Sequence, residues 1–178
     1  MGKTLGILFT FTTYGTWLRG DQRGWIEKGG KLMPPLPWLE KNDQSRMKHE
    51  PFLFELEHLD MLEDEIAVSL ITRKRVVVLA MHVAQWHTHF VIGATRHAVG
   101  VISKCAKDAA RYALRAGRPI WTDGYDKRFC FDEKSLRHRV RYVERHHGQH
   151  GRKLREQPYI TPVDEYLRQL ELPPVINI

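Results

Sequence analysis

The chain has 178 residues, which is enough for one domain with a substantial core. Hydrophobic residues make up 42% and charged residues 28% of the sequence, a balance that excludes a disordered chain and indicates a globular protein. The formal net charge of +7 makes a polyanionic partner the first binding hypothesis, although charge alone is a weak indication of nucleic acid. The sequence contains no apolar run of membrane-spanning length, no signal-peptide pattern and only two cysteines. We therefore expect one domain over residues 1–178, cytoplasmic and with free thiols.

A first strand is predicted from Leu5 to Thr13, where β-branched and aromatic residues dominate. The loop that follows, residues 14–25, mixes aromatic and arginine side chains with glycines. Stacking rings beside guanidinium groups suit unpaired bases and phosphates, so this loop is a candidate DNA contact. An equally good interpretation is a surface loop whose tryptophans close the edge of the core. The candidate DNA-contact residues are Trp17, Arg19, Arg23 and Trp25.

An irregular, proline-rich inserted loop region is expected from about Lys28 to Phe52. So long an insertion in a compact domain is usually functional or partly mobile. Helical spacing of Leu59, Leu62 and Ile66 then predicts a helix over residues 57–72.

Two strands are expected next, over residues 76–82 and 87–94, joined by a tight turn. Because strand side chains alternate between faces, His87 and His89 point the same way and stand close enough to share one metal ion. Trp86, Thr88 and Phe90 are expected on the opposite face. Taken alone, two such histidines are more often ordinary polar residues than metal ligands.

A second helix is predicted from Val99 to Ala116, with Gly117 as its C-cap. Lys104 and Arg111 belong to a basic stripe on this helix that could face phosphates or simply face water. A short strand is expected around residues 128–131, after a turn signal.

The last clear helix is predicted to begin near Asp132, an N-cap residue, and to run to Gly148. Its apolar seam is separate from a stripe of chemically reactive side chains, His138, Tyr142, His146 and Gln149. Arginines surround that stripe and are candidate DNA contacts, namely Arg137, Arg141 and Arg145. Residues 151–178 form a basic and then proline-punctuated C-terminal tail.

The order strand, helix, strand, strand, helix, strand predicts an α+β fold, a ferredoxin-like βαββαβ antiparallel sheet with an additional C-terminal helix. In that arrangement His87 and His89 face away from the two main helices. The last helix is then free to cover the open face and to bring Tyr142 over the metal.

The His87-Thr88-His89 motif, followed about 50 residues later by Tyr142 and a ligand-capable residue four positions on, resembles the single-tyrosine HUH nucleases. The chain is most similar to REP-associated tyrosine transposases and their insertion-sequence relatives. Further resemblance lies in residues 12–21, Thr-Thr-Tyr-Gly-Thr-Trp-Leu-Arg-Gly-Asp, and in residues 121–131. Three departures stand out: Thr88 replaces a bulky apolar residue, residues 84–86 replace Met-Pro-Asn, and His146 replaces a glutamine or asparagine.

The resemblance implies that His87, His89 and His146 hold a divalent ion, Mg²⁺ or Mn²⁺. It further implies that Tyr142 attacks a DNA phosphate, leaving a 5′-phosphotyrosine and a free 3′-OH. An all-imidazole site favours Mn²⁺ or a later transition metal over Mg²⁺. The implied partner is single-stranded or hairpin DNA, bound by a monomer or a homodimer.

The sequence leaves two alternatives open. One is a nucleic-acid-binding module of the same fold that has lost cleavage. The other is a zinc metallohydrolase in which a bound water, not Tyr142, is the nucleophile. Tyr125 is a fallback nucleophile, although it has no candidate ligand four residues later.

Overall fold

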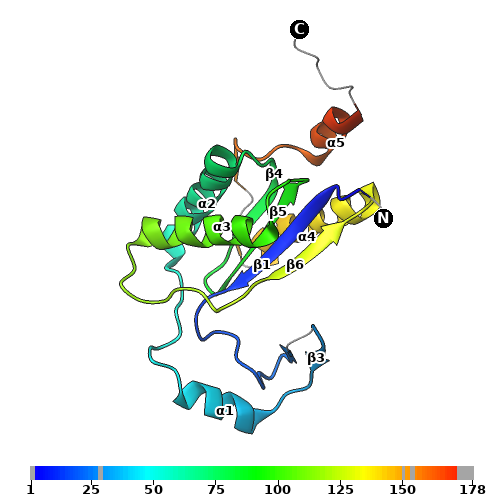
Figure 1. Cartoon of the computed structure of the whole chain (residues 1–178). Coiled ribbons are helices and arrows are strands. Elements are labelled where there is room, and N and C mark those ends of the chain that lie inside the picture. The colour runs from blue at the N-terminus through cyan, green and yellow to red at the C-terminus, as the bar shows by residue number, and fades with distance from the viewer. Residues whose placement is uncertain (1–2, 28–29, 150, 153–154, 172–178) are drawn as a thin grey trace.

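A sheet of four antiparallel strands lies at the centre of the domain. The structure, a computed structural model, describes residues 3–27, 30–149, 151–152 and 155–171. The strands are β1 (Gly6–Thr12), β4 (Val78–Val83), β5 (His87–Gly93) and β6 (Asp126–Cys130). They lie in the order β4-β5-β1-β6 (Figure 1). The His87–His89 strand is therefore internal, as predicted.

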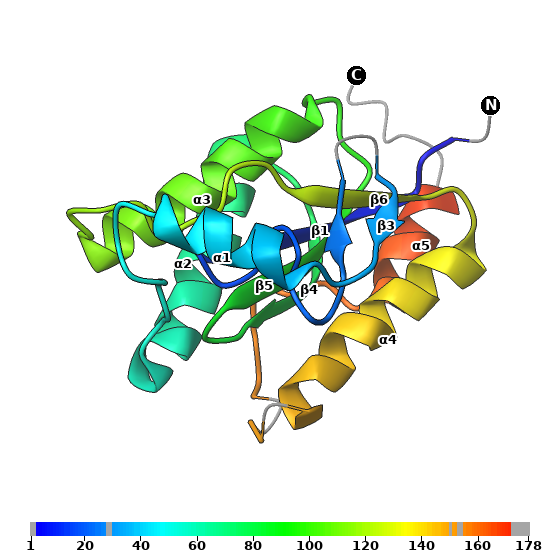
Figure 2. The same ribbon diagram turned by 90° about the horizontal axis from the view of Figure 1, so that it is seen from below.

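Helices cover both faces of this sheet. Their bounds are α2 (Leu59–Lys74), α3 (Val99–Leu114), α4 (Glu133–Gln149) and α5 (Val163–Glu171). Helices α2 and α3 lie together on one face, and α4 lies on the other (Figure 2). The chain thus follows the predicted βαββαβ order of an α+β fold, with α4 added. None of the helices in the described part of the chain is long and apolar enough to cross a membrane.

The strand alternation divides the core into two parts. Phe9 and Phe11 of β1 pack against α2 and α3 together with Phe90 of β5. Leu8 of β1 and Val91 of β5 point the other way, toward α4 and α5. This period of two, visible in the sequence, decides which side chains of β5 face α4.

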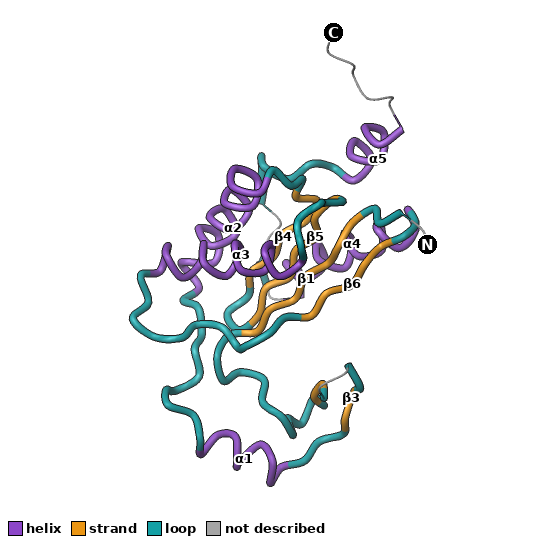
Figure 3. The backbone as a smooth tube through the Cα atoms, in the orientation of Figure 1, coloured by secondary structure: helices purple, strands orange, loops and turns teal. Residues whose placement is uncertain are grey.

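The region between β1 and α2 is more ordered than predicted. It holds a short hairpin of β2 (Trp25–Ile26) and β3 (Leu32–Met33), the helix α1 (Pro37–Ser45) and a single 3₁₀ turn, η1 (Leu56–His58) (Figure 3). The expectation of an irregular stretch missed α1 because none of its residues is buried, so it has no apolar stripe. Pro37 stands in the first helical turn, a position that proline favours.

The end of α3 also differs from the prediction. The residue with left-handed backbone is Arg115, with φ of 49°, and its N–H donates to the Tyr112 carbonyl oxygen. The helix therefore ends at Leu114, three residues before Gly117, and the prediction that Gly117 caps it is wrong. By contrast, Asp132 caps α4 as expected, because its Oδ1 accepts the Ser135 N–H at 2.7 Å.

The C-terminal tail is partly folded against the sheet. Ile160 forms a bridge beside Val78, and the Thr161 N–H donates to the Val78 carbonyl, which covers the outer edge of β4. The Tyr166 hydroxyl of α5 donates to the Leu5 carbonyl at 2.9 Å and accepts the Ala94 N–H at 2.7 Å. These contacts fix α5 beside α4.

Replacing Gly93 by alanine is expected to undo this docking. A Cβ at position 93 would lie 2.7 Å from two ring carbons of Tyr166, so the buried ring must move. Overpacking of this kind typically costs about 1–3 kcal/mol of unfolding free energy. Urea unfolding of Gly93→Ala should show the loss, whereas Gly117→Ala, which meets nothing within 4 Å, should not. Equal stability of the two variants would show that Tyr166 does not hold α5 against Gly93.

Candidate metal and tyrosine site

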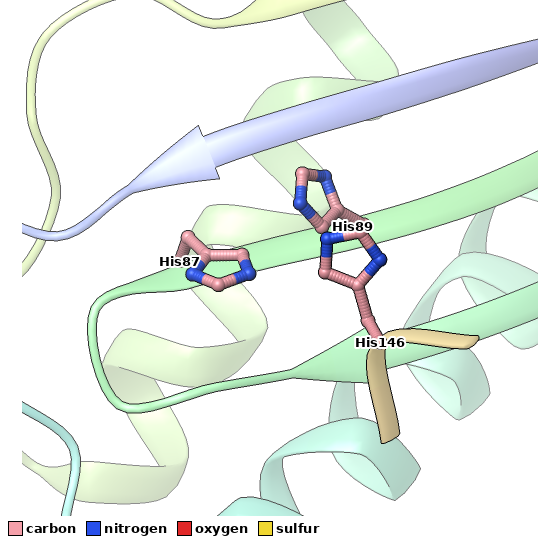
Figure 4. Close-up of side chains that lie close together, drawn as sticks. All are labelled: His87, His89 and His146. Atoms are coloured by element: carbon pink, nitrogen blue, oxygen red, sulfur yellow. The ribbon is translucent and has the colours of Figure 1, made fainter. Parts of the chain in front are cut away.

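Three imidazoles from two elements meet on the α4 face of the sheet. His87 and His89 stand on β5, and His146 reaches them from the last turns of α4 (Figure 4). One nitrogen from each ring lies within 4.8 Å of the other two. The ring centroids of His89 lie 4.7 Å from His87 and 4.6 Å from His146. The predicted grouping of the three histidines is therefore present in the structure.

Hydrogen bonds orient two of the three rings. His146 Nδ1 lies 2.8 Å from the Tyr142 carbonyl oxygen, which can only accept, so Nδ1 carries the proton and Nε2 the lone pair. His89 Nδ1 lies 2.9 Å from the hydroxyl of Thr10, its partner across the β1–β5 ladder. A second hydrogen-bonded nitrogen that orients the ring is characteristic of histidines that bind metals. The spacing of the three rings and the tautomer of His146 thus fit a divalent transition-metal ion.

Tyr142 adjoins the histidine group from one turn earlier on α4. Its ring centroid lies 4.4 Å from that of His146 and 5.4 Å from that of His89. The side chain is half-buried, and burial together with the nearby Asp126 carboxylate raises the pKa of the phenol. Tyr142 and the three histidines all come from one chain, so a single protomer carries the complete group.

The fallback nucleophile Tyr125 lies elsewhere. Its ring packs 6.0 Å from Phe9 and 6.5 Å from Phe11, which face α2 and α3. The sheet therefore separates Tyr125 from the histidines. Of these two tyrosines, Tyr142 is the one that lies beside them.

The segment that resembles the family, residues 12–21, positions the turn before His87. Thr13 is fully buried, and both its N–H and its hydroxyl donate to the Trp86 carbonyl. Trp86 lies in the β4–β5 turn and not in the strand, so the prediction that it faces the α2–α3 layer is wrong. Its ring lies 4.0 Å from that of His87 and packs edge-on against Trp17.

Arg23 completes an aromatic and cationic cluster beside His87. Its guanidinium carbon lies 5.2 Å from the Trp17 ring centroid and 4.9 Å from that of Trp86. Asp21 holds it through hydrogen bonds of 2.8 and 2.6 Å, so the group is fixed before any ligand arrives. Trp86 is a candidate binding residue that the sequence prediction missed.

The other two loop candidates are less available for contact. Trp25 is buried, and its indole N–H donates to the Pro34 carbonyl at 3.0 Å, so its expected role as a stacking surface does not fit the structure. Arg19 forms two hydrogen bonds to Asp43 of α1. The alternative interpretation of a structural loop therefore holds for Trp25.

The Asp21–Arg23 pair should make the stability of this loop depend on pH. The hydrogen bonds from Arg23 lower the pKa of Asp21 below its ordinary value, so the folded state favours the carboxylate. A depressed folded pKa stabilises the protein above the unfolded value of about 3.9, and this stabilisation is lost as the pH falls through the folded value. We expect Asp21→Asn to be less stable than wild type at pH 7 and to approach it at pH 3 in urea unfolding. A difference that stays constant over this range would contradict the pairing.

The predicted basic residues fall on opposite faces of the sheet. Lys104 and Arg111 lie on α3, across the sheet from the histidines, and Lys104 is paired with Asp108 at 2.7 Å. The arginines of α4 lie on the same helix as Tyr142, and Arg141 and Arg145 are exposed. Among the candidate DNA contacts on α3 and α4, the α4 set shares its helix with Tyr142 and His146: Arg137, Arg141 and Arg145.

A second buried cluster lies behind the first and was not predicted. His82 of β4, directly opposite His89 in the ladder, lies with His147 and Glu63 in the interior. Two sequence signals could have indicated it: Glu63 is the one charged residue among the buried positions of α2, and His147 follows His146. Hairpin register would have placed His82 on the face of His89.

Comparison with a solved structure identifies the fold. No protein-family model and no curated protein sequence matches the chain. A solved REP-associated tyrosine transposase bound to a REP hairpin is similar, with a TM-score of 0.50 and 13% identity over 92% of this chain and 87% of that one. A candidate transposase from Deinococcus radiodurans R1 has a TM-score of 0.46 and 15% identity, covering 81% of this chain and 92% of that one. The resemblance seen in the sequence is thus supported in three dimensions, and the chain has the fold of a REP-associated tyrosine transposase.

Proposed function

We propose that the protein is a metal-dependent nuclease-transposase that cleaves and rejoins single-stranded DNA through Tyr142. One observation carries the proposal: the imidazoles of His87, His89 and His146 converge beside the Tyr142 ring on one face of the sheet. The similar solved transposase is bound to a DNA hairpin, which makes DNA the reasonable substrate class here.

The chemistry follows from the groups present. A divalent ion held by His87, His89 and His146 would polarise the scissile phosphate. The Tyr142 oxygen forms a bond to phosphorus as the bond from phosphorus to the 3′ oxygen breaks, and overall the phenol proton ends on that 3′ oxygen. When another 3′-OH attacks the phosphotyrosine, the same step runs in reverse and the Tyr142 oxygen leaves. Joining of DNA strands therefore needs no nucleotide cofactor.

Two surfaces flank the reacting groups and suit a DNA strand. Trp17, Trp86 and the fixed Arg23 lie beside His87 and offer ring and guanidinium contacts to bases. Arg141 and Arg145 lie on the exposed side of α4, where they suit phosphates.

The salt dependence of binding should identify the phosphate contacts. We expect affinity for single-stranded DNA to fall steeply with salt, and Arg141→Gln and Arg145→Gln each to reduce the slope by about 0.7. Arg111→Gln serves as the matched control, because Arg111 lies across the sheet and should leave the slope unchanged. Fluorescence anisotropy over a range of salt concentrations measures the slopes. Equal effects of all three variants would show that the strand does not follow α4.

Cleavage itself tests the proposal. Labelled single strands and hairpins should be cut in the presence of Mn²⁺ and remain intact with a chelator. Binding without any cleavage would leave a nucleic-acid-binding module of the same fold. Cleavage that is insensitive to loss of Tyr142 would favour a metallohydrolase.

A further inference from the structure

Three buried side chains from three elements form a group behind the first histidine site. Glu63 of α2, His82 of β4 and His147 of α4 are each at most 2% exposed. One ligand atom from each lies within 4.8 Å of the other two. We propose that these residues form a second metal site, for Zn²⁺ or a similar transition ion, with a structural role.

The donor set and spacing fit such an ion. Glu63 Oε1 lies 3.4 Å from His147 Nε2 and 3.8 Å from His82 Nδ1. Bonds of about 2.0–2.1 Å in a tetrahedral site place ligand atoms about 3.3 Å apart, so these two distances to Glu63 need to shorten by at most about half an ångström. Two imidazoles and one carboxylate are a known protein ligand set for zinc, in which a water molecule fills the fourth position.

The Glu63 carboxylate also receives hydrogen bonds, which hold it in place. Its Oε1 accepts the Val83 N–H and the Arg152 guanidinium, each at 3.0 Å. Its Oε2 accepts the Gln157 amide at 2.9 Å and lies 3.5 Å from the Arg155 guanidinium. Carboxylates that bind metals are ordinarily held by such outer hydrogen bonds.

The two arginines beside Glu63 also have other partners. Arg152 pairs with Asp60, and Arg155 pairs with Asp64. Their positive charge is therefore shared with these aspartates and is not directed at Glu63 alone. Both His82 and His147 approach the same oxygen of Glu63, as ligands of one ion would.

The site's position explains what the ion would do. It would join α2, which covers one face of the sheet, to the edge strand β4 and to the end of α4. His147 follows His146 directly, and the His82 ring centroid lies 5.8 Å from that of His146 and 6.1 Å from that of His87. The ion would therefore fix the part of α4 that presents His146. This inference does not depend on the proposed nuclease activity.

Counting bound zinc tests the inference. The full chain is stripped with a chelator, titrated with Zn²⁺ and examined by native mass spectrometry. We expect two ions in wild type, one in the His87→Ala/His89→Ala double variant and one in His147→Gln. His138→Gln, an exposed histidine on the same helix, is the matched control and should keep two.

A second measurement leaves Glu63, His82 and His147 unchanged, so it cannot be confused by a variant that fails to fold. Zinc-edge X-ray absorption of the His87→Ala/His89→Ala variant should show the outer-shell scattering of two imidazole ligands, those of His82 and His147. Thermal unfolding of that variant should shift upward with Zn²⁺. The proposal is overturned if that variant binds no ion, if its ion has no imidazole ligand, or if folded His147→Gln keeps both ions.

Discussion

Replacing Tyr142 by phenylalanine is expected to abolish strand cleavage while leaving the fold and the affinity for DNA nearly unchanged. The variant keeps the ring that packs against His89 and His146 and removes only the oxygen that would bond to phosphorus. No other group can take over at that position, so the rate should fall by more than about three orders of magnitude, as for nucleophiles in other covalent enzymes. Single-turnover cleavage of a labelled hairpin measures the loss.

A matched control distinguishes loss of the nucleophile from the effect of removing a tyrosine hydroxyl elsewhere in the protein. Tyr112→Phe alters an exposed tyrosine on α3, across the sheet, and should cut at the wild-type rate. If Tyr142→Phe also cut at the wild-type rate, a metal-bound water would have to be the nucleophile.

Removing a histidine of β5 should abolish cleavage for a different reason. His87→Ala and His89→Ala each delete one of three ligands, so Mn²⁺ affinity and cleavage should be lost together. His146→Gln should retain part of the activity, because an amide oxygen can replace the imidazole and suits Mg²⁺ better. Calorimetric titration with Mn²⁺ and Mg²⁺, beside cleavage assays, measures both effects.

The control for this series is His97→Ala, which removes an exposed histidine that contacts the Lys74 carbonyl. It should leave ion binding and cleavage unchanged. Should His89→Ala bind Mn²⁺ as tightly as wild type and still cut DNA, the assignment of the β5 histidines as ligands would be wrong.

The sheet and its histidine face could be predicted because strand alternation is local and regular. The alternation of side chains along a strand was enough to place His87 and His89 on one face. The βαββαβ order then placed α4 over them. The spacing of four residues on a helix brought Tyr142 and His146 together. Each inference needed only periodicities that tertiary packing left intact.

Other features depended on contacts between distant segments and could not be read from local pattern. Trp86 was expected on the face opposite His87, but hydrogen bonds from Thr13 hold it in the turn beside His87. Trp25 was predicted to stack on bases, but in the structure it is buried within the β2–β3 hairpin region. The Glu63 cluster required knowing that α2, β4 and the end of α4 meet, which no single stretch of sequence reveals.

In the proposed mechanism, Tyr142 forms a covalent bond to DNA in the presence of a divalent ion. Intact-protein mass spectrometry after incubation with single-stranded hairpin DNA and Mn²⁺ tests this bond. We predict a mass increase equal to the 3′ portion of the cut strand, mapped by peptide sequencing to Tyr142 and absent with a chelator. Cleaved DNA without any covalent adduct, or an adduct mapped to another residue, would contradict the claim.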